Sequence, residues 1–225
     1  MRIITGLRPG RGRDGLVKVL LDGRPAFTLP IEEAVEAGLH VGDELSANQA
    51  KALAGSDRFH RCLAAATRYL GYRPRSQTEL TEKLRRRGFD GESIMAAIAR
   101  LKEKGFIDDA AFARFWKDNR ESFSPRSRQM ARLELKRKGV ADEVIEQAVA
   151  DIDNYDSAYR AAASRAHRWP VSDRQTFQRR AGEYLRRRGF SYEVINQTVS
   201  RLWREQGAAP ESKAPGQPAG NRTSK

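Results

Sequence analysis

The chain has 225 residues, of which 42 are lysine or arginine and 29 are aspartate or glutamate, so its formal net charge is +13. This excess favours a polyanionic partner: nucleic acid, an acidic protein surface or anionic lipid. The single cysteine, Cys62, excludes an internal disulfide. There is no apolar run of roughly 18 residues, as a membrane span needs, and no signal-like start. We therefore expect a soluble, cytoplasmic protein that does not bind membranes.

The positive charge is concentrated in the middle of the chain. Residues 1–55 hold seven basic and seven acidic side chains, residues 56–206 hold 32 and 21, and residues 207–225 hold three and one. The basic field therefore does not belong to a terminal arm.

Residues 1–55 are typical of a small α+β unit. Runs rich in β-forming residues lie at 2–7, 16–21 and 26–29, and a further short strand is expected within 41–45. Residues 8–15, RPGRGRDG, form a turn, and the dipeptide Asp22-Gly23 favours a hairpin. Pro30 begins a short helix that Gly38 ends, and Ser46 caps a second helix that runs to residue 54.

Residues 56–206 contain an internal repeat. The segments LRRRGFDGESI at 84–94, LKRKGVADEVI at 135–145 and LRRRGFSYEVI at 185–195 align without gaps, at offsets of 51 and 50 residues. In each, a leucine and three basic residues end a helix, glycine supplies the left-handed turn, an apolar residue packs back, and glutamate opens the next helix. The equivalent residues are Leu84, Leu135 and Leu185; Gly88, Gly139 and Gly189; Phe89, Val140 and Phe190; and Glu92, Glu143 and Glu193.

Another helix precedes each of these segments. The first helices of the three repeats are expected over residues 58–70, after an N-cap at Asp108 or Asp109, and after Asp156. The middle helices are expected to start at Ser76, with Glu79 completing a capping box, at Ser124-Pro125, and at Ser172 or Asp173.

These elements predict a mainly α protein in which tandem three-helix repeats form an elongated solenoid behind a small N-terminal α+β unit. The expected domains are the N-terminal unit (1–55), repeat 1 (56–105), repeat 2 (106–153), repeat 3 (154–206) and a disordered tail (207–225) that is rich in Gly, Pro, Ser and Ala.

Four blocks resemble the RecX family of bacterial recombination regulators: RPRSQTELTEKLRRRGF at 73–89, GFIDDAAFA at 105–113, LELKRKGVADEVIEQAV at 133–149 and LRRRGFSYEVI at 185–195. The resemblance implies a three-repeat helical modulator of the RecA recombinase in DNA repair and the SOS response. It would bind in the groove of the RecA–DNA filament and suppress strand exchange, ATPase and co-protease activities. Two features depart from the family pattern: Val140 where the other repeats have phenylalanine, and the Pro/Gly-rich tail.

The basic triplets are the sharpest candidates for partner and DNA binding. Positive charge at a helix end complements the helix dipole, which explains one triplet but not three at one period. Five further arginines lie just before or early in middle helices, where the dipole disfavours them and a ligand is a better reason. The candidates are Arg85, Arg86, Arg87, Lys136, Arg137, Lys138, Arg186, Arg187 and Arg188, together with Arg73, Arg75, Arg126, Arg128 and Arg132.

Nothing in the sequence indicates catalysis or a metal. His40, His60 and His167 lack metal-ligand spacing, and no nucleophile is paired with a base. We expect a monomeric, non-enzymatic regulator without a cofactor, which binds the RecA filament and contacts single-stranded DNA weakly and independently of sequence. The alternative is a stand-alone basic DNA-binding protein with helix-turn-helix-like units, which would bind bare DNA tightly without a recombinase.

Overall fold

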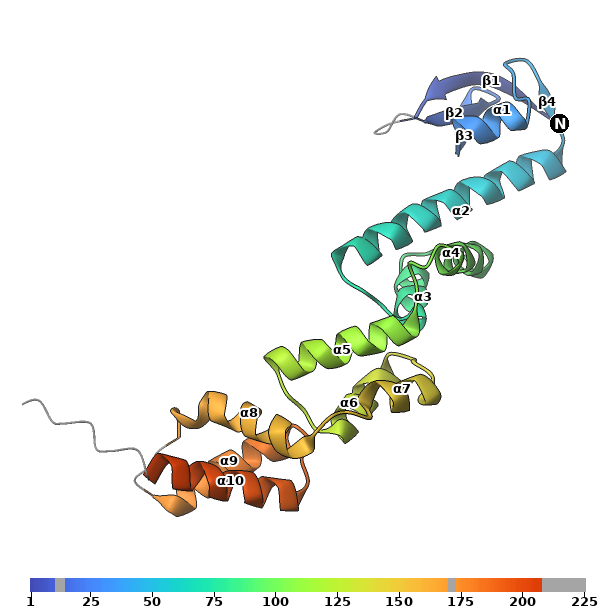
Figure 1. Cartoon of the computed structure of the whole chain (residues 1–225). Coiled ribbons are helices and arrows are strands. Elements are labelled where there is room, and N and C mark those ends of the chain that lie inside the picture. Colours follow the sequence, from blue (N-terminus) through green and yellow to red (C-terminus); the bar gives the residue numbers. More distant parts are fainter. Residues whose placement is uncertain (11–14, 170–172, 208–225) are drawn as a thin grey trace, which may run out of the picture. The chain divides into compact units, whose positions relative to one another are not determined.

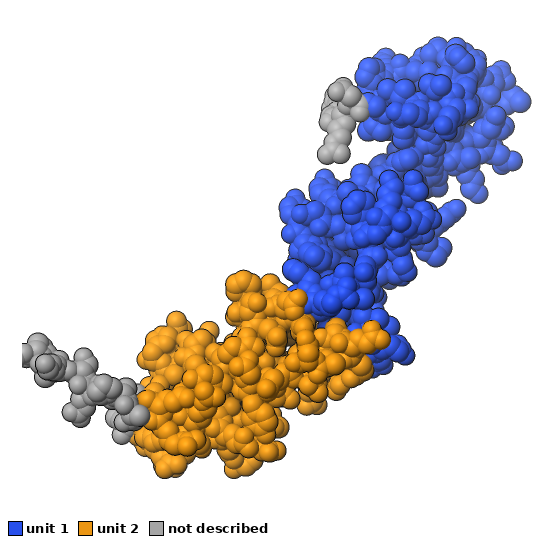
Figure 2. All heavy atoms as spheres, viewed as in Figure 1, with its two compact units in different colours: residues 1–115, 135–145 blue, residues 116–134, 146–225 orange. Residues whose placement is uncertain are grey.

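The computed structural model describes residues 1–10, 15–169 and 173–207. The chain divides into two compact units, shown in Figure 2: residues 1–115 with 135–145, and residues 116–134 with the chain from residue 146 onward. The expected tail beyond Gly207, residues 11–14 of the turn at 8–15 and the alternative helix start at Ser172 lie outside the described residues.

The N-terminal part is a four-stranded antiparallel sheet of order β3-β2-β1-β4. Its strands are β1 (Arg2–Pro9), β2 (Leu16–Leu21), β3 (Arg24–Pro30) and β4 (Glu44–Leu45), and the short helix α1 spans Ile31–Glu36. Asp22 and Gly23 both have positive φ, 50° and 77°, as the expected hairpin turn requires. The sheet buries Ile4, Val19 and Leu29 completely, so the small α+β unit is confirmed.

Helix α2 (Ala47–Tyr72) corrects one expectation, because it is a single helix where two were expected. Gly55, near the expected break, lowers helix stability by about 1 kcal/mol without breaking the ladder of backbone hydrogen bonds. The first half of α2 packs its Leu53 under the sheet, and the second half buries Cys62 and Ala66 in the core of repeat 1. Figure 1 shows α2 running between the sheet and the helices that follow it.

Each repeat contains three helices, as expected. Repeat 1 uses α2, α3 (Gln77–Arg86) and α4 (Gly91–Glu103). Repeat 2 uses α5 (Asp109–Phe123), α6 (Arg128–Arg137) and α7 (Asp142–Val149), and repeat 3 uses α8 (Asn154–Ala166), α9 (Arg174–Arg186) and α10 (Tyr192–Gly207). Apolar side chains at helical spacing form the cores, for example Leu80 and Leu84 in repeat 1 and Phe177 and Leu185 in repeat 3.

Two helices begin at residues that differ from those expected. Helix α6 begins after Ser127, whose Oγ accepts a hydrogen bond from the Met130 amide at 3.1 Å. Ser124, the expected start, binds Arg188 instead. Helix α8 begins after Asp153, which caps the first turn ahead of Asp156.

The expected caps at Asp108 and Asp173 are confirmed, and the capping box of α3 is confirmed only on one side. The Ser76 side chain accepts a hydrogen bond from the Glu79 amide, but the Glu79 carboxylate binds basic side chains instead of returning to Ser76.

The three basic helix ends share the expected geometry. Gly88, Gly139 and Gly189 have φ of 88°, 73° and 85°. In each repeat, the amide after the glycine bonds to the carbonyl of the helix-ending leucine at 3.3 Å. This is the Schellman arrangement, and it fixes each triplet in the last helical turn.

Every described helix is too short or too polar to traverse a lipid bilayer.

Candidate functional site on the basic helix ends

The first two residues of each basic triplet face solvent. Their side chains lie beside the last carbonyl groups of α3, α6 and α9, where positive charge is favourable. These exposed residues are Arg85, Arg86, Lys136, Arg137, Arg186 and Arg187. Because they are exposed, a partner can reach these six residues.

The third residue of the second triplet, Lys138, lies in a contact between repeats. The Ser76 hydroxyl donates to the Lys138 carbonyl at 2.5 Å, and Lys138 Nζ lies 3.4 Å from Glu79 Oε2. Only 28% of the Lys138 side chain is exposed. The end of α6 therefore docks on the start of α3, and Lys138 stabilises that contact.

Arg188, the third residue of the last triplet, occupies the equivalent contact in the second unit. Its carbonyl accepts a hydrogen bond from the Ser127 amide at 3.2 Å. Its guanidinium donates to Ser124 Oγ at 2.9 Å and to the Pro125 carbonyl at 3.0 Å. The end of α9 thus docks on the start of α6 by the same rule.

Arg87, the third residue of the first triplet, has no preceding repeat to contact. Its side chain is exposed and donates to the Tyr69 hydroxyl at 3.3 Å. That hydrogen bond is the main reason why the pKa of Tyr69 lies below its ordinary value, and the nearby positive charges add to it.

Close packing gives two of the three glycines a second role. A Cβ on Gly139 would lie 2.2 Å from Thr78 Oγ1, and a Cβ on Gly189 would lie 2.7 Å from Ser127 Oγ. A Cβ on Gly88 would meet no atom within 4 Å. Gly139 and Gly189 therefore permit the docking of one repeat on the previous one, in addition to ending their helices.

Arg73 and Arg75 have an internal partner in Glu79. Both guanidinium groups bind the Glu79 carboxylate, and the side chain of Arg75 is only 9% exposed. Burial alone would raise the pKa of Glu79, but the hydrogen bond and charge of Arg73, with the charge of Lys138, outweigh it and lower the pKa. These arginines anchor the loop before α3.

Arg126, Arg128 and Arg132 also have internal partners. Arg126 Nε lies 3.0 Å from Glu134, and Arg132 lies 2.5 Å from Glu146. Arg128 donates to the carbonyls of residues 150 and 152, at the end of α7, at 2.8 Å each. Contacts within the chain thus explain why an arginine is present at all five additional positions. A role of these arginines in binding a partner stays a prediction.

Sequence reasoning did not connect the two serines that contact the triplets, Ser76 and Ser127, with those triplets. Ser76 was expected only as a cap, and Ser127 was not singled out. The two residues lie 51 positions apart, the same offset that separates the first two triplets. That shared offset is the signal from which the contact between repeats could have been inferred.

The described residues do not form a metal centre, since no three His, Cys, Asp or Glu among them are placed to share an ion. Cys62 is fully buried, and burial raises the pKa of its thiol to about 11. His60 Nε2 lies 2.8 Å from Glu33 Oε2, which ties α1 to α2. These contacts favour packing roles over reactive ones.

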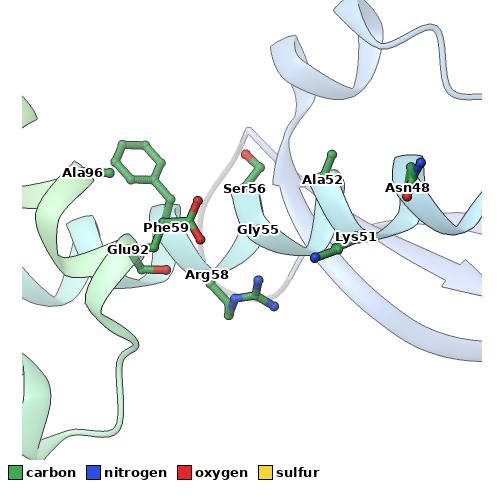
Figure 3. A pocket seen from close by; sticks show the side chains of 10 residues that line it. Asn48, Lys51, Ala52, Gly55, Ser56, Arg58, Phe59, Glu92 and Ala96 are labelled. Carbon is green, nitrogen blue, oxygen red and sulfur yellow. The ribbon is translucent and has the colours of Figure 1, made fainter.

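A pocket between α2 and the start of α4 carries mixed charge. Lys51 and Arg58 reach it from α2, and Glu92 reaches it from α4 (Figure 3). The Arg58 guanidinium is 3.4 Å from Asp90. Because positive and negative groups share the pocket, its charge selects neither anions nor cations.

Family models described as the first, second and third three-helix domains of RecX match residues 62–101, 108–149 and 151–199. The chain belongs to the RecX family. A "Regulatory protein RecX" of Chlorobaculum tepidum is 35% identical over 143 residues, which cover 64% of this chain and 89% of the relative. One of Clostridium botulinum (strain Eklund 17B / Type B) is 28% identical over 205 residues, which cover 88% of this chain and 95% of the relative.

Solved RecX structures share the fold. A crystal structure of a regulatory protein RecX superposes with a TM-score of 0.66 at 22% identity, over 89% of this chain and all of the other. RecX from Lactobacillus salivarius gives 0.54 at 24% identity, over 65% of this chain and 97% of the other. Three tandem three-helix domains are therefore the architecture of this chain and of these RecX proteins.

Proposed function

We propose that this chain is a non-enzymatic regulator that binds the RecA–DNA filament in the cytoplasm and lowers recombinase, ATPase and co-protease activity during DNA repair. The family's curated members are named as regulatory proteins, which supports a regulatory role. The RecA filament enters as the partner through the resemblance of the four sequence blocks to RecX proteins.

The observation that carries the proposal is the repeated, solvent-facing pair of cations at each middle-helix end. Arg85 with Arg86, Lys136 with Arg137, and Arg186 with Arg187 occupy equivalent positions, and docking contacts withdraw the third residue only in repeats 2 and 3. A filament presents repeated protomers along anionic DNA. Several weak contacts on one chain then add to a strong overall affinity.

Cosedimentation with preformed RecA filaments on single-stranded DNA tests this proposal. We expect the wild-type chain to pellet with filaments. The variant Arg85→Glu, Arg86→Glu, Arg186→Glu, Arg187→Glu should stay largely in the supernatant while its circular dichroism remains helical. A matched variant reverses four other exposed cations that lie outside the triplets: Lys51, Lys102, Lys104 and Arg114.

The matched variant should pellet much as the wild type does, because it changes the net charge equally but leaves the three basic triplets intact. If both variants lost pelleting to the same extent, the net charge of the chain and not the triplets would explain filament binding. Full pelleting of the triplet variant would contradict the proposed site. Tight, base-specific binding of the wild type to bare duplex DNA would favour the alternative of a stand-alone DNA-binding protein.

A further inference from the structure

The positive charge is divided unequally among the repeats. Repeat 1 (56–105) holds twelve basic and six acidic residues, and repeat 3 (154–206) holds eleven and five. Repeat 2 (106–153) holds nine basic and ten acidic residues. The excess charge of the helical region thus belongs to the two outer repeats, although all three repeats carry a basic triplet.

Internal ion pairs neutralise most of the cations of repeat 2. Lys117 lies 2.8 Å from Asp151, and Arg120 lies 2.8 Å from Glu134. The exposed triplet residue Lys136 lies 3.2 Å from Asp142. Beside it, Arg137 is exposed with no acidic partner among the described residues. The middle triplet therefore offers a partner less net charge than its sequence suggests.

One equivalent position shows how the repeats diverge. This position directly precedes the leucine of each triplet segment. It is occupied by Lys83 in repeat 1, by Glu134 in repeat 2 and by Tyr184 in repeat 3, which are 51 and 50 residues apart. In each repeat this residue meets a side chain from the first helix. Lys83 Nζ lies 5.1 Å from the ring centre of Tyr69, Glu134 pairs with Arg120, and Arg165 lies 5.5 Å from the ring centre of Tyr184.

The two kinds of contact have different electrostatic consequences. In repeat 2, Arg120 also lies 4.8 Å from the ring centre of Trp116, but the carboxylate of Glu134 cancels its charge. In the outer repeats an aromatic ring holds the cation by a cation–π contact, which leaves its full positive charge. Tyr69 and Tyr184 are each half-buried beside two or more cations, since Arg87 and Arg188 also contact them.

Helix α9 extends the basic surface of repeat 3. Arg179, Arg180, Arg186 and Arg187 are all exposed. Of the four, Arg179 acts on a nearby carboxylate, since its charge helps to lower the pKa of Asp173. In repeat 1, Arg85 is exposed in the same way, while the exposed Arg86 lies 3.7 Å from Glu82, a longer ion pair than the 3.2 Å pair of Lys136 with Asp142 in repeat 2. Each outer repeat thus combines exposed arginines with a tyrosine ring.

We infer that repeats 1 and 3 each bind the backbone of single-stranded DNA, and that the triplet of repeat 2 does not. Cations around aromatic rings are the recurrent means of binding a single strand without base preference. Each outer repeat lies within its own compact unit, so the inference needs no particular arrangement of the two units. It deepens the proposed function by naming which repeats contact DNA within the filament, and it rests on that function for its biological role.

Three double variants at equivalent positions test the inference. They are Arg85→Gln/Arg86→Gln, Lys136→Gln/Arg137→Gln and Arg186→Gln/Arg187→Gln, and each removes two charges from exposed helix ends. Binding to a fluorescein-labelled dT30 oligonucleotide is measured by anisotropy across a salt series, with no recombinase present. Circular dichroism and thermal unfolding of each full-length variant verify that it is folded.

We expect the first and third variants to bind several-fold more weakly than the wild type. The salt slope, d log K/d log[salt], should shrink by about 0.7 for each phosphate that the variant no longer neutralises. The middle variant should keep the affinity and slope of the wild type within twofold. Equal losses in all three variants, a loss confined to the middle variant, or no binding by the wild type at 50 mM salt would overturn the inference.

Measurements of dT30 binding and of pelleting with RecA filaments together distinguish failure of this inference from failure of the proposed function. A wild-type chain that pellets with RecA filaments but ignores dT30 would contradict only the assignment of DNA contacts. A chain that binds dT30 as expected but does not pellet with filaments would contradict the proposed function.

Discussion

The hydroxyl of Ser76 is hydrogen-bonded to the backbone carbonyl of Lys138, 62 residues further along the chain. Ser76 therefore takes part in two helix ends. Its hydroxyl caps the start of α3 and also donates a hydrogen bond to the Lys138 carbonyl at the end of α6. Ser127 and Arg188 repeat the relationship 51 and 50 residues later, with a backbone amide as the donor. In both contacts, the end of one repeat's middle helix packs on the start of the previous repeat's middle helix. The contacts involve the third residue of the second and third triplets, Lys138 and Arg188.

Replacing Ser76 should destabilise the protein more than replacing an ordinary cap. Ser76→Ala removes an N-cap, which typically lowers stability by about 1 kcal/mol, and it also removes the hydrogen bond from Ser76 to the Lys138 carbonyl. Ser46→Ala is the matched control, because Ser46 caps α2 at an exposed end. Urea unfolding should show the larger loss for Ser76→Ala, and equal losses would argue against the docking contact.

The glycines of the triplets should differ in their tolerance of alanine. Gly88→Ala should lower the unfolding free energy by about 1–2 kcal/mol, because positive φ disfavours a Cβ. Gly139→Ala should lower it by about 1–3 kcal/mol more, because its Cβ would overlap Thr78. Urea unfolding of both variants tests this order, and a Gly139 variant as stable as the Gly88 variant would refute the close packing.

Glu79 should make stability depend on acidity. Its folded-state pKa lies below the ordinary 4.5, so its contribution is present above that value and is lost as pH falls through the lower, folded pKa. Glu79→Gln should reduce stability near pH 7, because Arg73, Arg75 and Lys138 lose their shared partner. The difference between wild type and variant should narrow below pH 4.5 in urea titrations. A difference that stays constant across this range would contradict the role of the carboxylate.

Cys62 should be inert in the folded protein. Its side chain is fully buried, and its pKa of about 11 leaves almost no thiolate at neutral pH. We expect Ellman's reagent to modify Cys62 only as fast as the protein unfolds at pH 8, and fully in denaturant. Rapid stoichiometric modification without denaturant would show that the packing around α2 is loose enough to admit the reagent.

Local rules predicted most of the fold from the sequence. The leucine–triplet–glycine segments end helices through contacts between neighbouring residues, so Gly88, Gly139 and Gly189 adopt the expected conformation. The continuity of α2 was missed because it depends on two cores, one above Leu53 and one around Cys62, that neither local sequence reveals.

The candidate site was predictable only in part. The triplets were visible as a repeat, but sequence spacing does not distinguish an exposed cation such as Arg187 from a docking one such as Arg188. That distinction depends on contacts with residues more than 60 positions away, including Ser124. Likewise, the position of Arg75 before a helix did not reveal its pairing with Glu79.

In the function that we propose, exposed cations at the repeated helix ends control a recombinase filament. The most direct test is the single-stranded-DNA-dependent ATPase rate of RecA with this chain titrated in, beside the variant Arg85→Glu, Arg86→Glu, Arg186→Glu, Arg187→Glu. We expect the wild type to reduce the rate progressively and the variant to require at least tenfold more protein for the same effect. An ATPase rate and filament assembly that the wild type leaves unchanged would contradict the claim.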